Sequence, residues 1–357
     1  MKAFGILTSG GDCPGMNPTI RAAVFAAYDR GIRLYGVQRG FLGLHESDWK
    51  PLTPDKVDGI HRQGGTMLRT ARFAPFLDNA ARQPAIDRCV ANCKSNLDAE
   101  GAPEPIEGLI VIGGDGSFRG ASDLSKNGLP CVCLPGTIDN DISCTDYTIG
   151  FDTCLNTVTR MADTIADTSR SHDRCTLLEV MGNKAGDLAL YGGIAAGATG
   201  IFIMEHGGYP EDGEMSAEQV EAFHAAIIAR VDKARAAGKN YAIILIAEGI
   251  TGKKLKKTGT TRYPGGIQAL AGRIQALSGM ECRADVLGYV QRGGNPSARD
   301  RIIGSQMGVH AVDLLARGED NRIVVLHKNT ITDIDITMKC SKQLSQADIR
   351  LAQRVSL

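Results

Sequence analysis

Short apolar runs recur along the chain, and each is followed by a glycine- or aspartate-bearing turn and then by a helical spacing of apolar positions. The runs are continuously apolar rather than alternating, which is typical of parallel strands covered on both faces. The pattern therefore predicts an α/β fold with two doubly wound, Rossmann-like units and mainly parallel sheets. The strands expected are Ala3–Thr8, Gly108–Ile112, Cys131–Leu134, Thr176–Val180, Gly200–Met204, Tyr241–Ala247, Asp285–Val290 and Arg322–Leu326.

Helical patterns lie between these runs. One covers about Asn17–Arg30, and the longest, Ser216–Ala237, is amphipathic and ends before Gly238, a suitable C-terminal cap. A third, Gln346–Val355, is expected to pack on the second domain. The segment Gly252–Tyr263 carries four lysines (Lys253, Lys254, Lys256 and Lys257) among glycine and threonine. We expect a solvated surface loop there, with a phosphate contact as the alternative.

Composition excludes several classes of protein. The 357 residues suffice for two domains, and no apolar run is long enough to span a membrane. Forty basic residues balance forty acidic ones, which argues against nucleic acid or an anionic membrane as a partner. The N-terminal residues lack the features of a signal peptide, so a cytoplasmic protein is expected. The ten cysteines are scattered without a CxxC pair, which favours reduced structural thiols, with Cys131 and Cys133 on one strand face.

Glycine makes up 43 of the 357 residues and gathers in turns where strands end. Ligands bind at the carboxyl ends of strands in an open parallel sheet. The turn from Thr8 to Asn17 contains Gly10, Gly11 and Gly15, and precedes a helix whose N-terminus favours phosphate. Neither a GxGxxG nor a GxxxxGK[ST] motif fits this turn, so a Walker-type loop is excluded.

Two further turns add carboxylates. In Gly113–Ser117, Asp115 lies beside bare backbone, and a carboxylate next to phosphate implies Mg²⁺ between them. In Pro135–Asp141, two aspartates lie two residues apart and Thr137 lies two residues before the first. Such a pair suits phosphoryl transfer, because one carboxylate can take a proton from an alcohol while the other serves the metal. A helix cap at Asp115 and a surface turn at Asp139 are the plainer alternatives.

With these turns in this order, the chain resembles the phosphofructokinase family. The resemblance covers almost the whole chain up to about Arg301. It continues through Gly64-Gly65-Thr66 with Arg72, Gly150-Phe151-Asp152-Thr153, Glu179-Val180-Met181-Gly182, Ala247-Glu248-Gly249 and Leu287-Gly288-Tyr289-Val290-Gln291-Arg292-Gly293-Gly294.

The resemblance implies that ATP and fructose 6-phosphate are the substrates and that Mg²⁺ is required. Asp139 would be the general base on the 1-hydroxyl, assisted by Thr137 and Arg72, and Asp115 would hold the metal. The residues implied to hold ATP are Gly11, Arg72, Phe73, Gly114, Asp115, Gly116 and Ser117. Those implied to hold the sugar phosphate are Thr137, Ile138, Asp139, Arg174, Met181, Gly182, Asn183, Glu248, Arg283, Tyr289, Val290, Gln291 and Arg292.

The resemblance also implies an assembly. Arg174 and Arg283 would reach the 6-phosphate bound by a neighbouring subunit, so a homotetramer or homodimer with shared active sites is expected. The active site would lie in the cleft between two domains. We expect an ATP/Mg domain of residues 1–150 plus about 291–335, and a fructose 6-phosphate domain of residues 151–290 plus about 336–357.

Two glycines favour ATP over pyrophosphate as the phosphoryl donor. Pyrophosphate-dependent members of the family usually carry Asp where this chain has Gly116 and Lys where it has Gly136. An Asp at the first position would fill the space of the α-phosphate and repel it, and a Lys at the second would add charge that the smaller donor needs.

Several positions depart from the family pattern. Asn183 replaces an arginine, and we hypothesise that Lys184 partly restores the lost charge; Tyr289 replaces a histidine. Bacterial ATP-dependent members usually pair Arg21 with an arginine four residues later, but here that residue is Phe25. An apolar ring cannot bind phosphate, so an effector site for ADP or phosphoenolpyruvate is expected to be impaired.

Three alternatives stay open: a pyrophosphate-dependent phosphofructokinase, a kinase of another sugar or nucleoside, or a regulatory subunit that binds sugar phosphate without turning it over. Intact Asp115, Thr137, Asp139 and Asp141 argue against the last. NAD kinases share a Gly-Gly-Asp-Gly turn but offer no reason for the Gln-Arg-Gly-Gly block.

Overall fold

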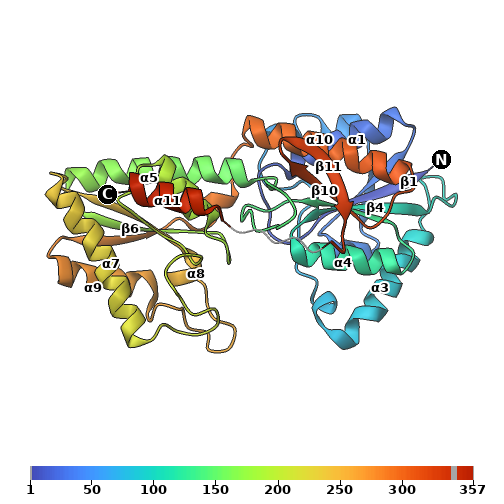
Figure 1. The fold of residues 1–357 in the computed structure, drawn as a ribbon. Helices are drawn as coiled ribbons and strands as arrows, with labels where there is room; N and C mark the ends of the chain where they lie inside the picture. Colours follow the sequence, from blue (N-terminus) through green and yellow to red (C-terminus); the bar gives the residue numbers. More distant parts are fainter. Residues whose placement is uncertain (1, 339–343, 357) are drawn as a thin grey trace. The chain divides into compact units, whose positions relative to one another are not determined.

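The computed structural model describes residues 2–338 and 344–356. The chain divides into two compact units. Within the described ranges, the first holds residues 2–138, 142–153 and 292–338, and the second holds residues 139–141, 154–291 and 344–356. Figure 1 traces both units in the colours of the sequence.

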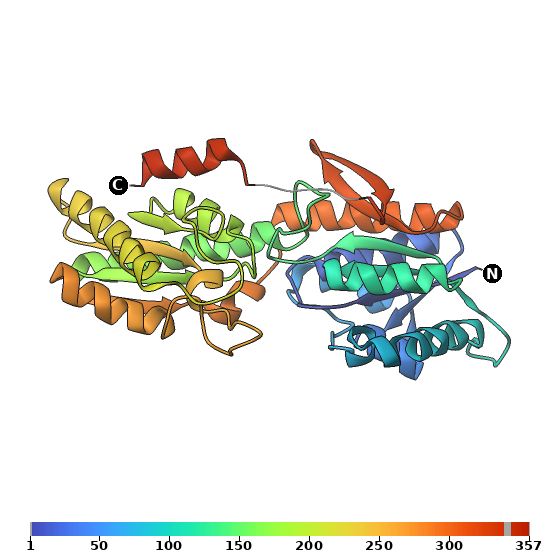
Figure 2. The same ribbon diagram turned by 60° about the horizontal axis from the view of Figure 1, so that its bottom comes forward.

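A mainly parallel sheet of seven strands forms the centre of the first unit, in the order β11-β10-β5-β4-β1-β2-β3. Among the described strands of this sheet, only β2–β3 and β10–β11 pair antiparallel. Helices α1 and α10 pack together on one face, while α3 and α4 cover the other (Figures 1 and 2). The strands are β1 (Ala3–Thr8), β2 (Arg33–Val37), β3 (Trp49–Leu52), β4 (Ile106–Gly113), β5 (Cys131–Pro135), β10 (Arg322–His327) and β11 (Thr330–Asp335). The helices are α1 (Met16–Asp29), α2 (Phe41–Glu46), α3 (Asn79–Lys94), α4 (Asp115–Lys126) and α10 (Ala298–Ala316), with 3₁₀ turns η1 (Pro54–Val57), η2 (Ile60–Arg62) and η3 (Ala74–Leu77).

The second unit has a fully parallel sheet of four strands in the order β7-β8-β6-β9. Helices α7 and α9 pack on one face, and the C-terminal helix α11 packs on α6. The strands are β6 (Cys175–Val180), β7 (Gly200–Phe202), β8 (Ala242–Ala247) and β9 (Cys282–Val286). The helices are α5 (Phe151–Ser171), α6 (Asp187–Ala195), α7 (Ala217–Ala236), α8 (Glu248–Thr251), α9 (Gly266–Ser278) and α11 (Gln346–Val355), with the 3₁₀ turn η4 (Gly288–Arg292).

The α/β class and its mainly parallel sheets are confirmed, but the strand predicted over Asp285–Val290 is wrong. The strand there is β9, which ends at Val286, and a 3₁₀ turn follows. Gly288 adopts a φ of +55°, a left-handed conformation that interrupts an extended chain. The strand predicted over Gly200–Met204 is also shorter and ends at Phe202.

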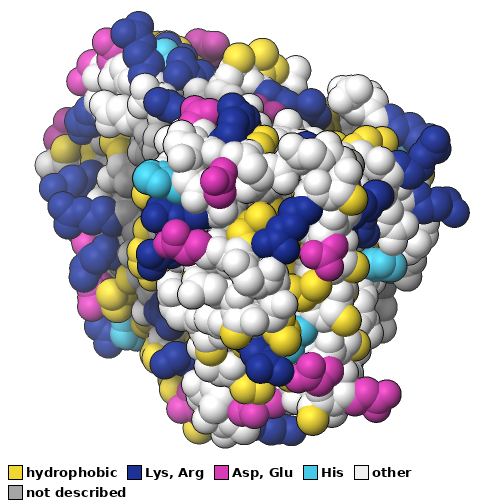
Figure 3. All heavy atoms as spheres, turned by 90° about the vertical axis from the view of Figure 1, so that its left-hand side faces the viewer, with side chains coloured by type: hydrophobic (Ala, Val, Ile, Leu, Met, Phe, Trp, Pro, Cys, Tyr) yellow, Lys and Arg dark blue, Asp and Glu magenta, His cyan; other side chains and the backbone are white. Residues whose placement is uncertain are grey.

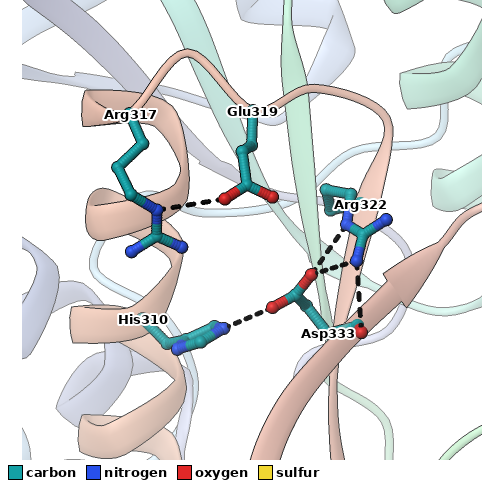
Figure 4. Close-up of polar contacts among 5 residues, drawn as sticks. All are labelled: His310, Arg317, Glu319, Arg322 and Asp333. Atoms are coloured by element: carbon teal, nitrogen blue, oxygen red, sulfur yellow. Dashed lines mark hydrogen bonds and ion pairs between the residues drawn. The ribbon is translucent and has the colours of Figure 1, made fainter.

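The C-terminal hairpin of the first unit is held on α10 by one carboxylate. Asp333 on β11 accepts hydrogen bonds from His310 of α10 (2.8 Å) and from Nε of Arg322 on β10 (2.7 Å), and Figure 4 shows both. Burial alone would raise the pKa of Asp333, but these two bonds outweigh it and hold the pKa below its usual value. The hairpin is therefore fixed to the helix by a charged contact.

The described cysteines are free thiols, as predicted, and Cys340 lies outside the described residues. Cys131 and Cys133 share one apolar core, as their alternation on β5 indicated. No helix in the described part of the chain is long and apolar enough to cross a membrane. On the face drawn in Figure 3, acidic and basic side chains are interspersed rather than gathered by sign, in keeping with the charge balance.

Candidate active site

Three turns begin at the carboxyl edge of the first unit's sheet. Strands β1, β4 and β5 are parallel neighbours, so their ends lie together. The Ser9 N–H donates to the Ile112 carbonyl (2.9 Å), and the Gly136 N–H donates to the Gly113 carbonyl (3.0 Å). The strand order reverses at β1, because β2 lies on one side of it and β4 on the other. The carboxyl edge at such a switch point is the usual ligand site of an open α/β sheet.

The first turn carries bare backbone and is braced from behind. Gly10 has a φ of +86°, which a side chain would disfavour. The buried Asn17 side chain donates to the carbonyls of Gln63 and Gly64 and accepts from the Met67 N–H. Asn17 thereby fixes the Gly64-Gly65-Thr66 segment beside the first turn and positions the chain that leads to Arg72.

Arg292 lies against this first turn. Its Nη1 donates to the Asp12 carbonyl (3.3 Å), and a Cβ added to Gly11 would collide with its guanidinium. The sequence implied a sugar-phosphate role for Arg292, and the structure places its side chain at the turn implied to hold ATP. Both residues belong to the first unit.

The second turn begins α4 and leaves its first N–H groups without a side-chain cap. Ser117 is buried, whereas Asp115 and Gly116 are exposed. No other described heavy atom lies within 4 Å of the Cβ position of Gly114 or Gly116. The turn is thus open backbone at a helix N-terminus, the arrangement that binds phosphate.

The exposed carboxylate of Asp115 fits a magnesium site. Among the described residues, no three His, Cys, Asp or Glu side chains are grouped to hold a metal ion. Mg²⁺ does not need such a cage, because it is typically held by one or two carboxylates, substrate phosphates and water. A single carboxylate beside an open phosphate-binding turn meets that requirement.

The third turn is shaped by a residue to which the sequence assigned no role. Asn140 lies between Asp139 and Asp141, is buried, and has a φ of +52°. Its Nδ2 donates to Oδ1 of Asp187 at the start of α6 (3.0 Å). Asn tolerates this left-handed conformation better than most residues, so Asn140 sets the direction in which the flanking aspartates leave the turn. The sequence feature that could have indicated this role is the position of Asn140 between two aspartates.

Thr137 and Ile138 lie on the sheet side of this turn, in the first unit. The Thr137 N–H donates to the Ile149 carbonyl (3.1 Å), and the Thr148 hydroxyl donates to the Thr137 carbonyl (2.7 Å). The Thr137 backbone is therefore fixed, and its side chain is half-buried. Asp139 is half-buried and falls in the second unit.

Arg72 and Phe73 differ in their surroundings. Arg72 is exposed, whereas the Phe73 ring packs edge-on against Phe76 with ring centroids 5.1 Å apart and lies 5.3 Å from His45. Phe73 thus provides an aromatic wall in the first unit, and Arg72 provides a solvated cation beside it.

Glu248 orders the backbone of the residues in the second unit that were implied to hold the sugar phosphate. It begins α8 at the end of β8, and its Oε1 accepts from the N–H groups of Gly182 (3.3 Å) and Asn183 (2.7 Å). Gly182 has a φ of +147°, and a Cβ there would collide with the Ala185 carbonyl. The buried Gln291 side chain accepts from the Met181 N–H (3.0 Å) and donates to the Gly288 carbonyl (3.0 Å). The turn after β6 is thus held from both sides.

Arg174 and Arg283 are held side by side by one carboxylate. Arg174 Nε lies 2.9 Å from Glu281 Oε2, and Arg283 Nε donates to Glu281 Oε1 (2.9 Å). Hydrogen bonds from Arg174 and then Arg283 lower the pKa of Glu281, so this carboxylate stays ionised. Cys175 and Cys282, the neighbours of the two arginines in sequence, are register partners of β6 and the edge strand β9. Arg174 and Arg283 therefore lie at the same end of the neighbouring strands β6 and β9.

The remaining predicted residues are exposed. Tyr289 is 82% exposed and Val290 is 55% exposed, both on η4. The residues implied to hold ATP all lie in the first unit, and most of those implied to hold the sugar phosphate lie in the second. The structure also adds Lys253, which the sequence assigned to a solvated loop. Its ammonium donates to the Asn183 side-chain carbonyl, and no sequence signal distinguished it from its three lysine neighbours.

Comparisons with known proteins point to one family. The sequence model of a family described as Phosphofructokinase matches residues 3–315. A Tolumonas auensis protein named ATP-dependent 6-phosphofructokinase is 44% identical over 336 residues, which is 94% of this chain and 92% of that protein. A Brevibacillus brevis protein of the same name is 42% identical over 359 residues, covering the whole of both chains. The solved phosphofructokinase of Saccharomyces cerevisiae matches with a TM-score of 0.77 and 27% identity, over 99% of this chain and 46% of the yeast chain.

Proposed function

The chain belongs to the phosphofructokinase family, and from this premise we propose that it transfers the γ-phosphoryl group of ATP to the 1-hydroxyl of D-fructose 6-phosphate. The products are fructose 1,6-bisphosphate and ADP, as in glycolysis. The observation that carries the proposal is the set of three turns at one sheet edge, which combines open backbone, an exposed carboxylate and the Thr137–Asp141 turn.

ATP is assigned to the first unit. The N–H groups at the start of α4, with Gly114, Gly116 and Ser117, bind phosphate oxygens, and the Gly11 turn adds further N–H groups. Phe73 packs against the nucleotide. Asp115 would hold Mg²⁺, which would neutralise negative charge on the phosphates.

Asp139 is the general base. Its carboxylate takes the proton of the 1-hydroxyl as that oxygen bonds to the γ-phosphorus and the bond to the departing ADP oxygen breaks. Thr137 donates a hydrogen bond at the acceptor. Arg72 contributes a positive charge that stabilises the charge developing on the transferred phosphoryl group.

The sugar phosphate is assigned mainly to the second unit. Glu248 and the backbone of Met181, Gly182 and Asn183 orient the sugar hydroxyls. The remaining residues assigned to the acceptor are Ile138, Tyr289, Val290, Gln291 and Arg292.

We assign ATP rather than pyrophosphate as the donor. The space beside Gly116 is open, so the α-phosphate and the rest of the nucleotide can pass there. Beside Gly136 the chain is closely packed, and a Cβ would lie 2.6 Å from the Ile112 Cγ2 atom. A lysine side chain, which the smaller donor needs, does not fit that position without a change at Ile112.

The active form is proposed to be a homotetramer or homodimer in the cytoplasm. Arg174 and Arg283, paired through Glu281, bind the 6-phosphate held by a neighbouring copy. This arrangement predicts complementation between two inactive variants. An Asp139→Asn chain still offers its arginines, and an Arg174→Ala chain still offers its base.

Co-refolding the two variants should recover about a quarter to a half of the wild-type activity, because some mixed sites regain both groups. Each variant refolded alone is the control. Mixed oligomers, verified by differential tags, that are as inactive as their parents would contradict a shared site.

The proposed function is tested by measuring fructose 1,6-bisphosphate formation from fructose 6-phosphate, with Mg²⁺ and either ATP or pyrophosphate. Turnover with ATP alone is expected. Turnover with pyrophosphate would place the donor choice outside Gly116 and Gly136. A folded protein that uses neither donor would instead be a kinase of another acceptor or a regulatory subunit.

A further inference from the structure

The turn of the second unit implied to hold the sugar phosphate carries an uncharged side chain, Asn183, next to the carboxylate of Glu248. Asn183 follows Gly182, and its N–H donates to Glu248. Asp139, the proposed base, belongs to the same unit. Phosphoryl transfer to a sugar bound by these residues brings more negative charge to the acceptor site, so a positive group is required there to balance that charge.

The loop after α8 delivers such a group. The Lys253 N–H donates to the Glu248 carbonyl (2.7 Å), which fixes the start of the loop on the helix. The Lys253 side chain turns inward, and its ammonium donates to Oδ1 of Asn183. Unlike Lys254, Lys256 and Lys257, which are exposed, Lys253 is half-buried.

The loop is ordered by its own contacts. Leu255 is buried, its N–H donates to the Thr260 carbonyl (2.7 Å), and its carbonyl accepts from the Gly259 N–H (2.9 Å). Arg262, also buried, donates to the carbonyls of Gly249 and Pro210, both at 2.6 Å. The base of the loop is thus tied to α8, which places Lys253 reproducibly.

Four charged groups act on the Lys253 ammonium. Burial lowers its pKa most; the negative charges of Glu248 and Asp139 raise it, and the positive charges of Lys184 and Arg262 lower it. Lys253 is therefore within electrostatic reach of both the residue that orients the sugar and the proposed base. Lys184 is exposed, and Lys253 is the lysine hydrogen-bonded to Asn183.

We propose that Lys253 is a cation of the phosphoryl-transfer site, binding an oxygen of the phosphoryl group as it passes to the 1-hydroxyl. This inference rests on the proposed function. It assigns to Lys253 the charge compensation that the sequence suggested for Lys184. It also gives the 252–263 loop a role in the reaction beyond that of a solvated surface segment.

The test compares Lys253→Met and Lys253→Gln with Lys253→Arg. Glutamine keeps a donor for Asn183 without the charge, and arginine keeps the charge. We expect kcat to fall about tenfold or more in the Met and Gln variants, with the KM for fructose 6-phosphate within about twofold of wild type. The arginine variant should retain most of kcat. The acidic limb of the kcat/KM profile should move to higher pH when the charge is lost.

Lys257→Ala, on the same loop but exposed, is the matched control, and Lys184→Ala tests the earlier hypothesis directly. Calorimetric binding of fructose 6-phosphate in the absence of ATP shows whether each variant keeps a folded acceptor site. An unchanged kcat, or a raised KM at constant kcat, would overturn the proposal. Wild-type protein that does not use ATP and fructose 6-phosphate would refute the proposed function itself.

Discussion

Gly11 and Arg292 show how much one missing side chain matters at the donor turn. The guanidinium of Arg292 lies where a Cβ on residue 11 would be. Gly11→Ala should therefore displace Arg292 and narrow the phosphate turn, lowering kcat/KM for ATP by about tenfold or more. The free energy of unfolding should change little, because the displaced atoms are the far end of a flexible side chain. Steady-state kinetics and thermal unfolding check both expectations.

Gly272→Ala is a suitable control for this variant. Gly272 lies within α9, no other described heavy atom is within 4 Å of its Cβ position, and it is not among the assigned site residues. Alanine there should stabilise the helix by about 0.5–1 kcal/mol and leave kinetics unchanged. A Gly11→Ala enzyme with wild-type kinetics would show that Arg292 moves freely from the turn.

The three turns could be placed from the sequence because they follow buried strands, whose ends meet at one edge. The other site residues were assigned through the family resemblance, and their roles stay predictions. Asn140 and Lys253 were missed for different reasons. Asn140 acts through a left-handed backbone and a partner, Asp187, that is 47 residues away. Lys253 is one of four similar lysines, and only the fold of the loop turns it inward.

At the scale of elements, long apolar strands were predictable and edge strands were not. β1, β4 and β5 are fully buried in runs of five residues or more, apart from Glu107. β3 and β11 carry polar or half-exposed residues and pair antiparallel at the sheet margins, so their sequences resemble turns. The strand was predicted too far along the chain because Val286, Leu287, Tyr289 and Val290 look like one apolar strand. β9 instead ends at Val286, and the left-handed Gly288 begins a 3₁₀ turn.

The start of α10 depends on a buried carboxylate. Both oxygens of Asp300 are used: Oδ1 accepts from the Gly150 N–H and Oδ2 from the Thr153 N–H, each at 2.8 Å. The Thr153 hydroxyl also donates to Oδ2 (2.5 Å). Asp300→Asn replaces an acceptor with an amide that faces these donors, so a loss of about 1–3 kcal/mol of stability is expected in urea unfolding.

Asp300 also predicts a pH dependence. Burial raises its pKa to about 6, although the hydrogen bonds oppose this. The folded pKa lies above the unfolded value near 3.9, so the stabilisation is complete below the unfolded pKa and is lost as pH rises through about 6. The stability gap between wild type and Asp300→Asn should therefore be about 1 kcal/mol larger at pH 5 than at pH 7. A gap that widens toward pH 7 would contradict this assignment.

At the scale of the whole molecule, the expected response to effectors depends on Arg21 and Phe25 of helix α1. The Arg21 guanidinium carbon lies 4.4 Å above the centre of the Phe25 ring, so the residue at the usual second arginine position packs against the first. This face offers one cation and an apolar ring. We expect nearly hyperbolic saturation by fructose 6-phosphate and no response to phosphoenolpyruvate. Initial rates over a range of substrate concentrations test this, and strong sigmoidality that ADP reverses would refute it.

The close packing of Gly136 against Ile112 limits the order in which this lineage can evolve a new donor. Aspartate at position 116 enters open space and is accessible in a single step. Lysine at position 136 is not, because the Ile112 side chain must shrink first. A chain with lysine at position 136 must therefore move or replace the Ile112 side chain, so a change of donor at this position is expected to need a second substitution at residue 112.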